Sequence, residues 1–246
     1  MNKRNYTILS NRTVAPNVFR MELAADGAPQ HRCGQFVEVE VPGKFLRRPL
    51  SVSLSEPGKL TLLYKVVGEG TAWLAQAQSG TSLELLAELG NGFDTEACRE
   101  RALLVGGGIG VAPLHQLCRD LRAAGKRVTA ILGFNTASEI ILRDELEALG
   151  ATVHIATMDG SDGIRGLVTD ALREVRPDFD HYYVCGPMPM MRALYPLLPD
   201  DGEFSLEERM GCGTGLCFGC TVQTTAGPRR ICHDGPVFKK NELPWQ

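Results

Sequence analysis

Residues 102–113 read ALLVGGGIGVAP, and this stretch decides the fold class of the central part of the chain. The apolar run 102–105 is typical of a buried strand, and the glycines after it lead into an apolar helical stretch that ends near Ala124. Further strand candidates at 127–132, 152–156 and 181–185 alternate with helix candidates at 139–149 and 167–175. Strands that alternate with helices predict a parallel sheet with crossover helices.

The N-terminal part of the chain shows strand signals in closer succession. Apolar and polar residues alternate over 36–41, and a second apolar run covers 60–67. Turn-forming residues separate such runs at 25–27, 42–43 and 56–58. Short strands with regular turns predict a small antiparallel barrel. One helix is expected to interrupt the barrel, with Thr71 as its N-cap.

Four of the eight cysteines lie close together near the C-terminus. Their spacing, C-x4-C-x2-C and a fourth C after eleven residues, is that of plant-type [2Fe–2S] proteins. Glycines at 211, 213, 215 and 219 allow the backbone to approach a cluster and to aim N–H groups at its sulfur atoms. The alternatives are a structural zinc site, although zinc ligands usually come as two separated pairs, and disulfides or free thiols. The spacing predicts a cluster bound by Cys212, Cys217, Cys220 and Cys232.

The composition restricts the classes of function. The 246 residues carry a net charge of −3, which gives no indication of a nucleic-acid partner or an anionic membrane. We find no signal peptide and no apolar run long enough to span a bilayer, so the expected location is the cytoplasm, where disulfides are rare. The remaining cysteines are expected to be small core residues, with Cys185 as an exception: Cys33, Cys98, Cys118 and Cys185.

The glycines of 106–110 lie where nucleotide phosphates bind in many α/β proteins, since backbone N–H groups and a helix N-terminus meet there. The pattern G-x-G-x-x-G fails because position 111 is valine, and residues 126–133 lack the acidic residue that accompanies it. A pyridine-nucleotide loop of another type and a structural turn are both open at this point. The strand 181–185 leads into Gly186 and Pro187 at the same sheet edge, which favours the nucleotide.

Several motifs together resemble the ferredoxin–NADP reductase superfamily. They are Arg48-Pro49-Leu50-Ser51, the glycine stretch 106–113, Cys185-Gly186-Pro187, and the cysteine run that ends in CHDGPVF at 232–238. With that last run, the chain is similar to the electron transfer subunits of dihydroorotate dehydrogenase B over nearly its whole length. The resemblance implies a multidomain β and α/β fold, with an FAD-binding antiparallel β-barrel at 1–98, an NAD-binding parallel-sheet domain at 99–202 and a small [2Fe–2S] domain at 203–246.

The resemblance also implies the residues of the sites. The residues expected to hold FAD are Arg48, Pro49, Leu50, Ser51, Leu63, Tyr64, Lys65, Gly70 and Thr71. The residues expected to hold NAD(H) are Gly106, Gly107, Gly108, Gly110, Gly186 and Pro187. Arg48 is expected to pair with the FAD pyrophosphate. The candidate catalytic residues are Ser51, whose hydroxyl would reach the flavin N5 region, and Cys185, which would lie beside the nicotinamide.

The roles of three barrel positions are left open. Leu50 stands where many superfamily members have a tyrosine that stacks on the flavin, so the stacking partner is undetermined and Tyr64 is a candidate. Arg47 and Arg48 have the alternative of being solvated surface charges, because exposed arginine is common.

These cofactors together define an electron path. A nicotinamide gives two electrons as hydride and a [2Fe–2S] cluster takes one at a time, which requires a flavin between them. No site for a final organic substrate is recognised, so a second polypeptide is expected. The resemblance implies an FMN-containing subunit that oxidises dihydroorotate, in a heterotetramer, with electrons passing to NAD+ in pyrimidine biosynthesis. The alternatives are the same module in a sulfite reductase, hydrogenase or ferredoxin–NADP reductase complex, and a non-enzymatic iron–sulfur redox sensor.

The segment after the second strand of the nucleotide domain bears on the choice of nucleotide. NADP requires cationic side chains around its 2′-phosphate. Residues 133–139 contain no Lys or Arg, and Glu139 would repel that phosphate. Arg143 lies further along, inside the expected helix, and His154 and Met158 offer no fixed cation. We therefore expect NAD(H), as the resemblance also implies.

Overall fold

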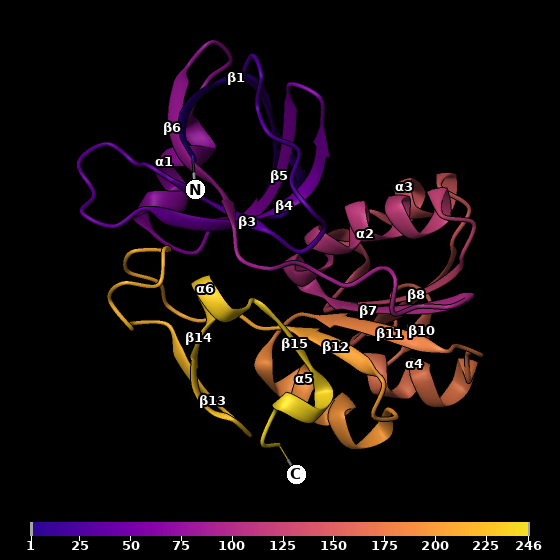
Figure 1. Cartoon of the computed structure of the whole chain (residues 1–246). Coiled ribbons are helices and arrows are strands. Elements are labelled where there is room, and N and C mark those ends of the chain that lie inside the picture. The colour runs from indigo at the N-terminus through magenta and orange to yellow at the C-terminus, as the bar shows by residue number, and fades with distance from the viewer. Residues whose placement is uncertain (1, 246) are drawn as a thin grey trace.

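The computed structural model describes residues 2–245, and its N-terminal part is the expected closed antiparallel barrel (Figure 1). The order of strands around the barrel is β1-β2-β5-β4-β3-β6. Their bounds are β1 (Asn2–Ala15), β2 (Val18–Ala24), β3 (Phe36–Val39), β4 (Arg48–Glu56), β5 (Lys59–Lys65) and β6 (Ser82–Leu89). Helix α1 (Glu69–Gln76) connects β5 to β6.

Strand β3 differs from the alternation that its sequence predicts, because all four of its residues are buried. Val37 and Val39 point into the barrel core, as strand geometry requires of alternate residues. Phe36 and Glu38 face outward but are covered by the C-terminal part of the chain. A Cβ on Gly213 would lie 2.6 Å from Cγ of Glu38, which shows how closely the two segments approach.

The rest of the chain is organised around a seven-stranded sheet in the order β10-β9-β8-β7-β11-β12-β15. All neighbouring pairs are parallel except β12 and β15. The strands are β7 (Arg101–Gly107), β8 (Arg127–Phe134), β9 (Thr152–Thr157), β10 (Ile164–Arg165), β11 (His181–Cys185), β12 (Gly202–Ser205) and β15 (Val237–Lys239). The helices beside them are α2 (Ala112–Ala123), α3 (Arg143–Ala148), α4 (Val168–Val175) and α5 (Met188–Leu194).

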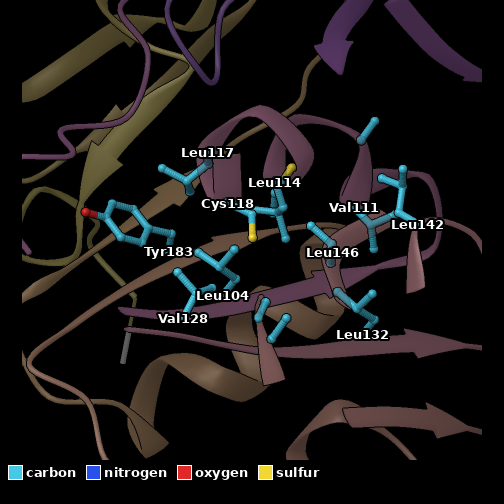
Figure 2. Packing of buried hydrophobic residues seen from close by; sticks show 14 of the residues in the cluster. Leu104, Val111, Leu114, Leu117, Cys118, Val128, Leu132, Leu142, Leu146 and Tyr183 are labelled. Carbon is cyan, nitrogen blue, oxygen red and sulfur yellow. The ribbon is translucent and has the colours of Figure 1, made fainter. Parts of the chain in front are cut away.

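Two apolar cores lie on the two faces of this sheet. Leu104 of β7 packs with Leu114 and Leu117 of α2 on the face nearer the barrel (Figure 2). The neighbouring residues Leu103 and Val105 point to the other face, where α4 and α5 cover them. Because both faces of β7 are buried, its sequence is a continuous apolar run, which is why residues 102–105 identify the fold.

Three predicted element boundaries are corrected by the structure. Thr71 is the third residue of α1 and not its N-cap, which is Gly68. The Thr71 hydroxyl instead accepts the N–H groups of residues 67 and 68 at 2.9 and 3.2 Å. The helix expected at 139–149 is a short 3₁₀ turn, Ala137–Glu139, followed by α3, because Leu142 adopts a left-handed backbone (φ 64°). Strand β7 extends two residues beyond Val105, through the first two glycines.

The C-terminal segment is built onto the seven-stranded sheet. Strand β12 spans the expected boundary at 202/203, and β15 pairs with it as the edge strand. Between them lie a hairpin, β13 (Thr221–Thr224) with β14 (Gly227–Arg230), and helix α6 (Ile231–Asp234). Phe204, Ile231 and Phe238 share one core with α5. The cysteine-bearing segment therefore obtains its core from the sheet, which its own length could not supply.

Polar contacts join the barrel to both other parts of the chain. On α2, Gln116 Nε2 donates to the carbonyl of His31 at 2.6 Å, and Arg119 Nη1 donates to that of Ser55 at 3.0 Å. Asn91, which follows β6, donates its side-chain amide to the carbonyl of Val237 at 2.8 Å and accepts that residue's N–H at 3.1 Å. The barrel is thus held at two separate places.

Within residues 2–245, no helix combines the length and the apolar content needed to cross a membrane.

Candidate cofactor sites

A cavity of about 330 Å³ opens where the barrel faces the other two parts of the chain. The barrel residues that line it include most of those expected to hold FAD: Arg48, Pro49, Leu50, Ser51, Leu63, Tyr64, Lys65 and Thr71. They converge because β4 and β5 are neighbours in the barrel and α1 follows β5 directly. Ile109 and Ala112 form a wall from the nucleotide-binding part, and Met210 and Pro236 form one from the C-terminal segment.

Arg48 and Lys65 provide the positive charges at this cavity. The Arg48 guanidinium lies over Gly70 in the first turn of α1, so closely that a Cβ on Gly70 would overlap it. The first-turn N–H groups of a helix and an arginine are both suited to a phosphate. Gly70 itself is not part of the cavity wall; it leaves room for Arg48. Arg47, in contrast, pairs with Glu84 and Glu40 on the barrel surface and lies away from the cavity.

The walls offer apolar and hydroxyl groups. Ser51 of β4 lines the cavity beside Leu50, and it is opposite Phe36 in the barrel register. Tyr64 also lines the cavity, but its ring is stacked on Phe19 at 5.7 Å and its hydroxyl donates to Asn11 Oδ1 at 3.0 Å. This set of two cations, hydroxyls and flat apolar surface fits the isoalloxazine and pyrophosphate of a flavin nucleotide.

A second cavity, of about 560 Å³, lies at the carboxyl ends of the sheet strands. The expected nucleotide residues that line it are Gly107, Gly108, Gly110, Gly186 and Pro187. Gly106 lies one step behind them, paired with Cys185 in the sheet. A Cβ on Gly110 would lie 2.5 Å from Cα of Gly186, so the two loops can approach this closely only with glycine at position 110. The cavity fits a dinucleotide, since open α/β sheets bind such ligands at this edge.

The two cavities share three lining residues, Lys65, Ile109 and Glu207. Glu207 follows β12 and was not identified in the sequence, because an isolated glutamate next to a strand carries no motif. Its side chain faces the open cavities, while the surrounding protein raises the pKa of its carboxyl group. A ligand in one cavity therefore comes into reach of a ligand in the other, with a carboxyl group at the junction.

Cys185 lies behind this junction. Its thiol is buried at 1% exposure and lines neither cavity. Burial raises the pKa of the thiol well above its usual value, the Glu207 carboxylate adds to that shift, and a hydrogen bond with the Ser205 hydroxyl opposes it. Cys185 is therefore a neutral thiol at neutral pH, adjacent to the Gly186 backbone of the nucleotide cavity.

The segment 133–139, which is expected to select the nucleotide, lines the nucleotide cavity. Asn135, Glu139 and Met158 line it, and Glu139 Oε2 accepts the Asn135 side-chain amide at 2.8 Å. Arg143 is directed elsewhere: its Nη2 lies 2.9 Å from Asp162 Oδ2, and it lines a different cavity. Among the described residues around the nucleotide cavity, the one cation is Lys65, at the end shared with the other cavity.

The four C-terminal cysteines lie on two adjoining segments, the loop 211–220 and helix α6. The sulfur of Cys212 accepts the N–H groups of residues 214, 216 and 217 at 3.3–3.4 Å. Gly215 N–H donates to Cys232 Sγ at 3.1 Å, and Cys232 N–H donates to Cys220 Sγ at 3.4 Å. Such N–H···S contacts are what an iron–sulfur cluster requires of its loop, so the donor set and the backbone fit the [2Fe–2S] prediction.

The four thiols have different environments. Burial raises the pKa of Cys212, but the N–H groups of Thr214 and Cys217 outweigh it and lower that pKa to about 5. Burial and the adjacent Cys220 raise the pKa of Cys232 to about 12, so iron binding there must release a proton. In the described part of the chain, no group of three or more His, Cys, Asp or Glu side chains is spaced as ligands to a single metal ion.

Two models of protein families match the chain. An iron–sulfur cluster binding domain of dihydroorotate dehydrogenase B matches residues 207–244, and an oxidoreductase NAD-binding domain matches residues 104–195. The first includes the cysteine segment together with Glu207, and the second includes the glycine loop and Gly186.

Two relatives align with this chain over nearly the whole length of both chains. The dihydroorotate dehydrogenase B (NAD(+)) electron transfer subunit of Bacillus caldolyticus is 42% identical over 98% of each chain. The subunit of that name from Lysinibacillus sphaericus is 41% identical over 96% of each chain.

Solved structures show how widely the fold occurs. The NADH-dependent reduced ferredoxin–NADP oxidoreductase, described in terms of flavin-based electron bifurcation, is 31% identical with a TM-score of 0.88, covering 98% of this chain and 90% of that one. A flavohemoglobin from Malassezia yamatoensis is 20% identical with a TM-score of 0.69, covering 80% of this chain and 56% of that one, and it shows likeness of fold alone.

Proposed function

This chain belongs to the family of electron transfer subunits of dihydroorotate dehydrogenase B, and on that premise we propose that it carries electrons between NAD(H) and a separate subunit that oxidises dihydroorotate. The observation that carries the proposal is the arrangement of the cavities. The flavin cavity meets the nucleotide cavity on one side and is walled by the cysteine-bearing segment on the other.

The cofactors of the chain are FAD, NAD(H) and a [2Fe–2S] cluster. When bound, FAD exchanges hydride with a nicotinamide and single electrons with the cluster. The protein residues supply position and charge. In our proposal, Arg48 and the first turn of α1 bind the FAD pyrophosphate, and the glycines 107, 108 and 110 admit the nucleotide phosphates.

The proposed catalytic residues are Ser51, which lines the flavin cavity, and Cys185, which lies behind the wall of the nucleotide cavity. Ser51 presents its hydroxyl to the N5 region of the flavin, and Cys185 supports the nicotinamide from behind Gly186. Because the Cys185 thiol is neutral, its proposed role is packing and orientation, with no proton transfer. Cys185→Ser is expected to slow flavin reduction by NADH while FAD and cluster contents stay unchanged, and stopped-flow reduction would measure this.

The proposed partner is an FMN-containing subunit, assembled with this chain as a heterotetramer, with net flow from dihydroorotate to NAD+. Support for a docking surface comes from the cysteine loop. Leu216 and Phe218 flank Cys217 with exposures of 81% and 65%, so apolar side chains surround the position where electrons would leave the chain.

A second candidate is the same module in an NADH-dependent ferredoxin–NADP reductase. The TM-score of 0.88 to such an enzyme favours it, but that identity is 31%, against 41–42% for the dihydroorotate dehydrogenase B subunits. We therefore retain it as the alternative.

The proposal can be tested on anaerobically purified chain. We expect one FAD, two irons and two acid-labile sulfides per chain, with rapid flavin bleaching by NADH followed by reduction of the cluster. Cys217→Ser is expected to remove the cluster and retain FAD. Pull-down with mass spectrometry is expected to recover an FMN protein that oxidises dihydroorotate. Stoichiometric zinc without labile sulfide would exclude the cluster, and a flavin that NADH does not bleach would point to a redox sensor.

A further inference from the structure

Arg230 connects the two segments that carry the four cysteines. It ends strand β14 and precedes Ile231, the first residue of helix α6, in which Cys232 lies. Its Nη1 donates to the carbonyl of Gly215 at 2.6 Å, and its guanidinium lies 4.9 Å from the centre of the Phe218 ring. Asp234 holds the arginine from the other side. Its Oδ2 accepts the Arg230 backbone N–H at 2.8 Å and lies 3.5 Å from Arg230 Nε.

The peptide unit between Gly215 and Leu216 is the point where Arg230 acts. A trans peptide is planar, so its carbonyl and its N–H point in opposite directions. Arg230 binds the carbonyl, and the N–H on the other side donates to Cys212 Sγ at 3.3 Å. The arginine thereby fixes the direction of this N–H, and its positive charge polarises the peptide toward the sulfur.

The preceding peptide unit, between Thr214 and Gly215, adjoins the anchored carbonyl, because both units share Gly215. The Gly215 N–H donates to Cys232 Sγ at 3.1 Å. A Cβ at this residue, whose φ is +84°, would lie 2.8 Å from Cβ of His233, so the loop can approach helix α6 this closely only with glycine. Two of the four sulfurs thus receive an N–H from the backbone that Arg230 anchors.

Hydrogen bonds to the sulfurs, and net charge nearby, are what set the reduction potential of a cluster. Reduction adds one negative charge, which aligned N–H groups stabilise more than they stabilise the oxidised state. The charge of Arg230 is partly balanced by Asp234, which also lies 2.9 Å from His233 Nδ1. The orientation of the peptide is therefore expected to contribute more than the bare charge.

We propose that Arg230 is a positioning residue that raises the reduction potential of the cluster by directing the backbone of residues 215 and 216 at the sulfurs of Cys212 and Cys232. This rests on the proposed ligation of the cluster by the four cysteines.

Potentiometric titration of the complete FAD- and cluster-containing protein, followed by EPR, tests the inference. For Arg230→Gln we expect the equilibrium between oxidised and reduced cluster to shift about tenfold toward oxidised, which is about 59 mV for one electron. Arg230→Lys keeps the charge but lacks the fork that holds both Gly215 and Asp234, so about a threefold shift in the same direction is expected. The flavin potential should be unchanged in both.

Arg229→Gln is the matched control, because Arg229 is exposed and its side chain contacts none of the described residues through a hydrogen bond or ion pair. Its cluster potential should equal that of the wild type. A wild-type potential in fully loaded Arg230→Gln overturns the inference. Should that variant hold no cluster, Arg230→Lys decides in the same way: a lowered potential supports the inference and a wild-type one overturns it. Wild-type protein without iron and labile sulfide would instead disprove the proposed function.

Discussion

The two adjacent arginines of the barrel have different surroundings, although their sequence context is the same. Arg48 lies over the first turn of α1 and lines the flavin cavity, whereas Arg47 pairs with Glu84 and Glu40. We predict that Arg48→Ala weakens FAD binding by about 1.5–3 kcal/mol, roughly ten- to hundredfold, since a charge-assisted contact to phosphate is lost. Arg47→Ala should bind FAD as the wild type does. Equal affinities of Arg48→Ala and wild type, measured by fluorescence titration, would contradict the assignment of this cavity.

Glu203 gives the protein a pH dependence that does not depend on any cofactor. It is buried in β12, and although it accepts the Asp94 N–H at 3.0 Å, burial raises its pKa from 4.5 to about 7. Because the pKa of Glu203 is higher in the folded protein than in the unfolded chain, ionisation of its carboxyl group destabilises the fold. The folded state is therefore most stable at low pH, and this stability is lost as the pH rises from about 5 to 7. The free energy of unfolding falls by at most about 3 kcal/mol over this range.

We therefore predict that the melting temperature of the wild type falls more between pH 5.5 and pH 8 than that of Glu203→Gln, whose side chain cannot ionise. About 1 kcal/mol corresponds to roughly 2–4 °C for a chain of this size. Glu96→Gln, at an exposed position, should behave as the wild type does. Parallel pH profiles of wild type and Glu203→Gln in differential scanning calorimetry would show that Glu203 does not titrate in this range.

The segment between β8 and α3 is the element that we expect to select the nucleotide. Glu139 lines the nucleotide cavity there, and Arg143 is held by Asp162 outside it. We predict a preference for NADH over NADPH of at least about tenfold in kcat/KM, or about 1.4 kcal/mol. Glu139→Gln should reduce that preference by removing the repulsion of the 2′-phosphate, while Glu147→Gln on the exposed face of α3 should not. Steady-state rates with ferricyanide as acceptor would measure both, and equal use of NADPH by the wild type would disprove the prediction.

Elements that depend on local sequence could be predicted, and those that depend on distant contacts could not. The strand at 102–105 and the cysteine spacing are local signals, and both identify their surroundings correctly. The burial of Glu38 could not be read from β3, because the covering residue, Gly213, lies 175 residues further along. For the same reason β15 was not expected: a three-residue strand forms only because β12 offers it an edge. Glu207 was missed because the junction it lines is formed by three separate parts of the chain.

At the scale of the whole molecule, the exposed loop around Cys217 should be the place where a partner docks. We predict that Leu216→Asp prevents co-purification with the partner subunit and electron transfer to it, while NADH–ferricyanide activity stays at the wild-type level, because the flavin is unaffected. Leu9→Asp, which places the same charge at an exposed leucine of β1, should leave the complex intact. A complex that survives Leu216→Asp in size-exclusion chromatography would locate the docking surface elsewhere.

The attachment of the barrel at two places has a consequence for the kinetics. Contacts from α2 to residues 31 and 55, and from Asn91 to Val237, fix the flavin cavity relative to the cysteine loop. An electron passing between them then crosses a gap of constant width and need not wait for one domain to diffuse toward the other. Added glycerol should accordingly slow the capture of NADH and the encounter with the partner, in proportion to solvent viscosity, but leave the flavin-to-cluster step unchanged in freeze-quench measurements. A viscosity-dependent flavin-to-cluster step would mean that this electron transfer requires movement of one domain relative to the other.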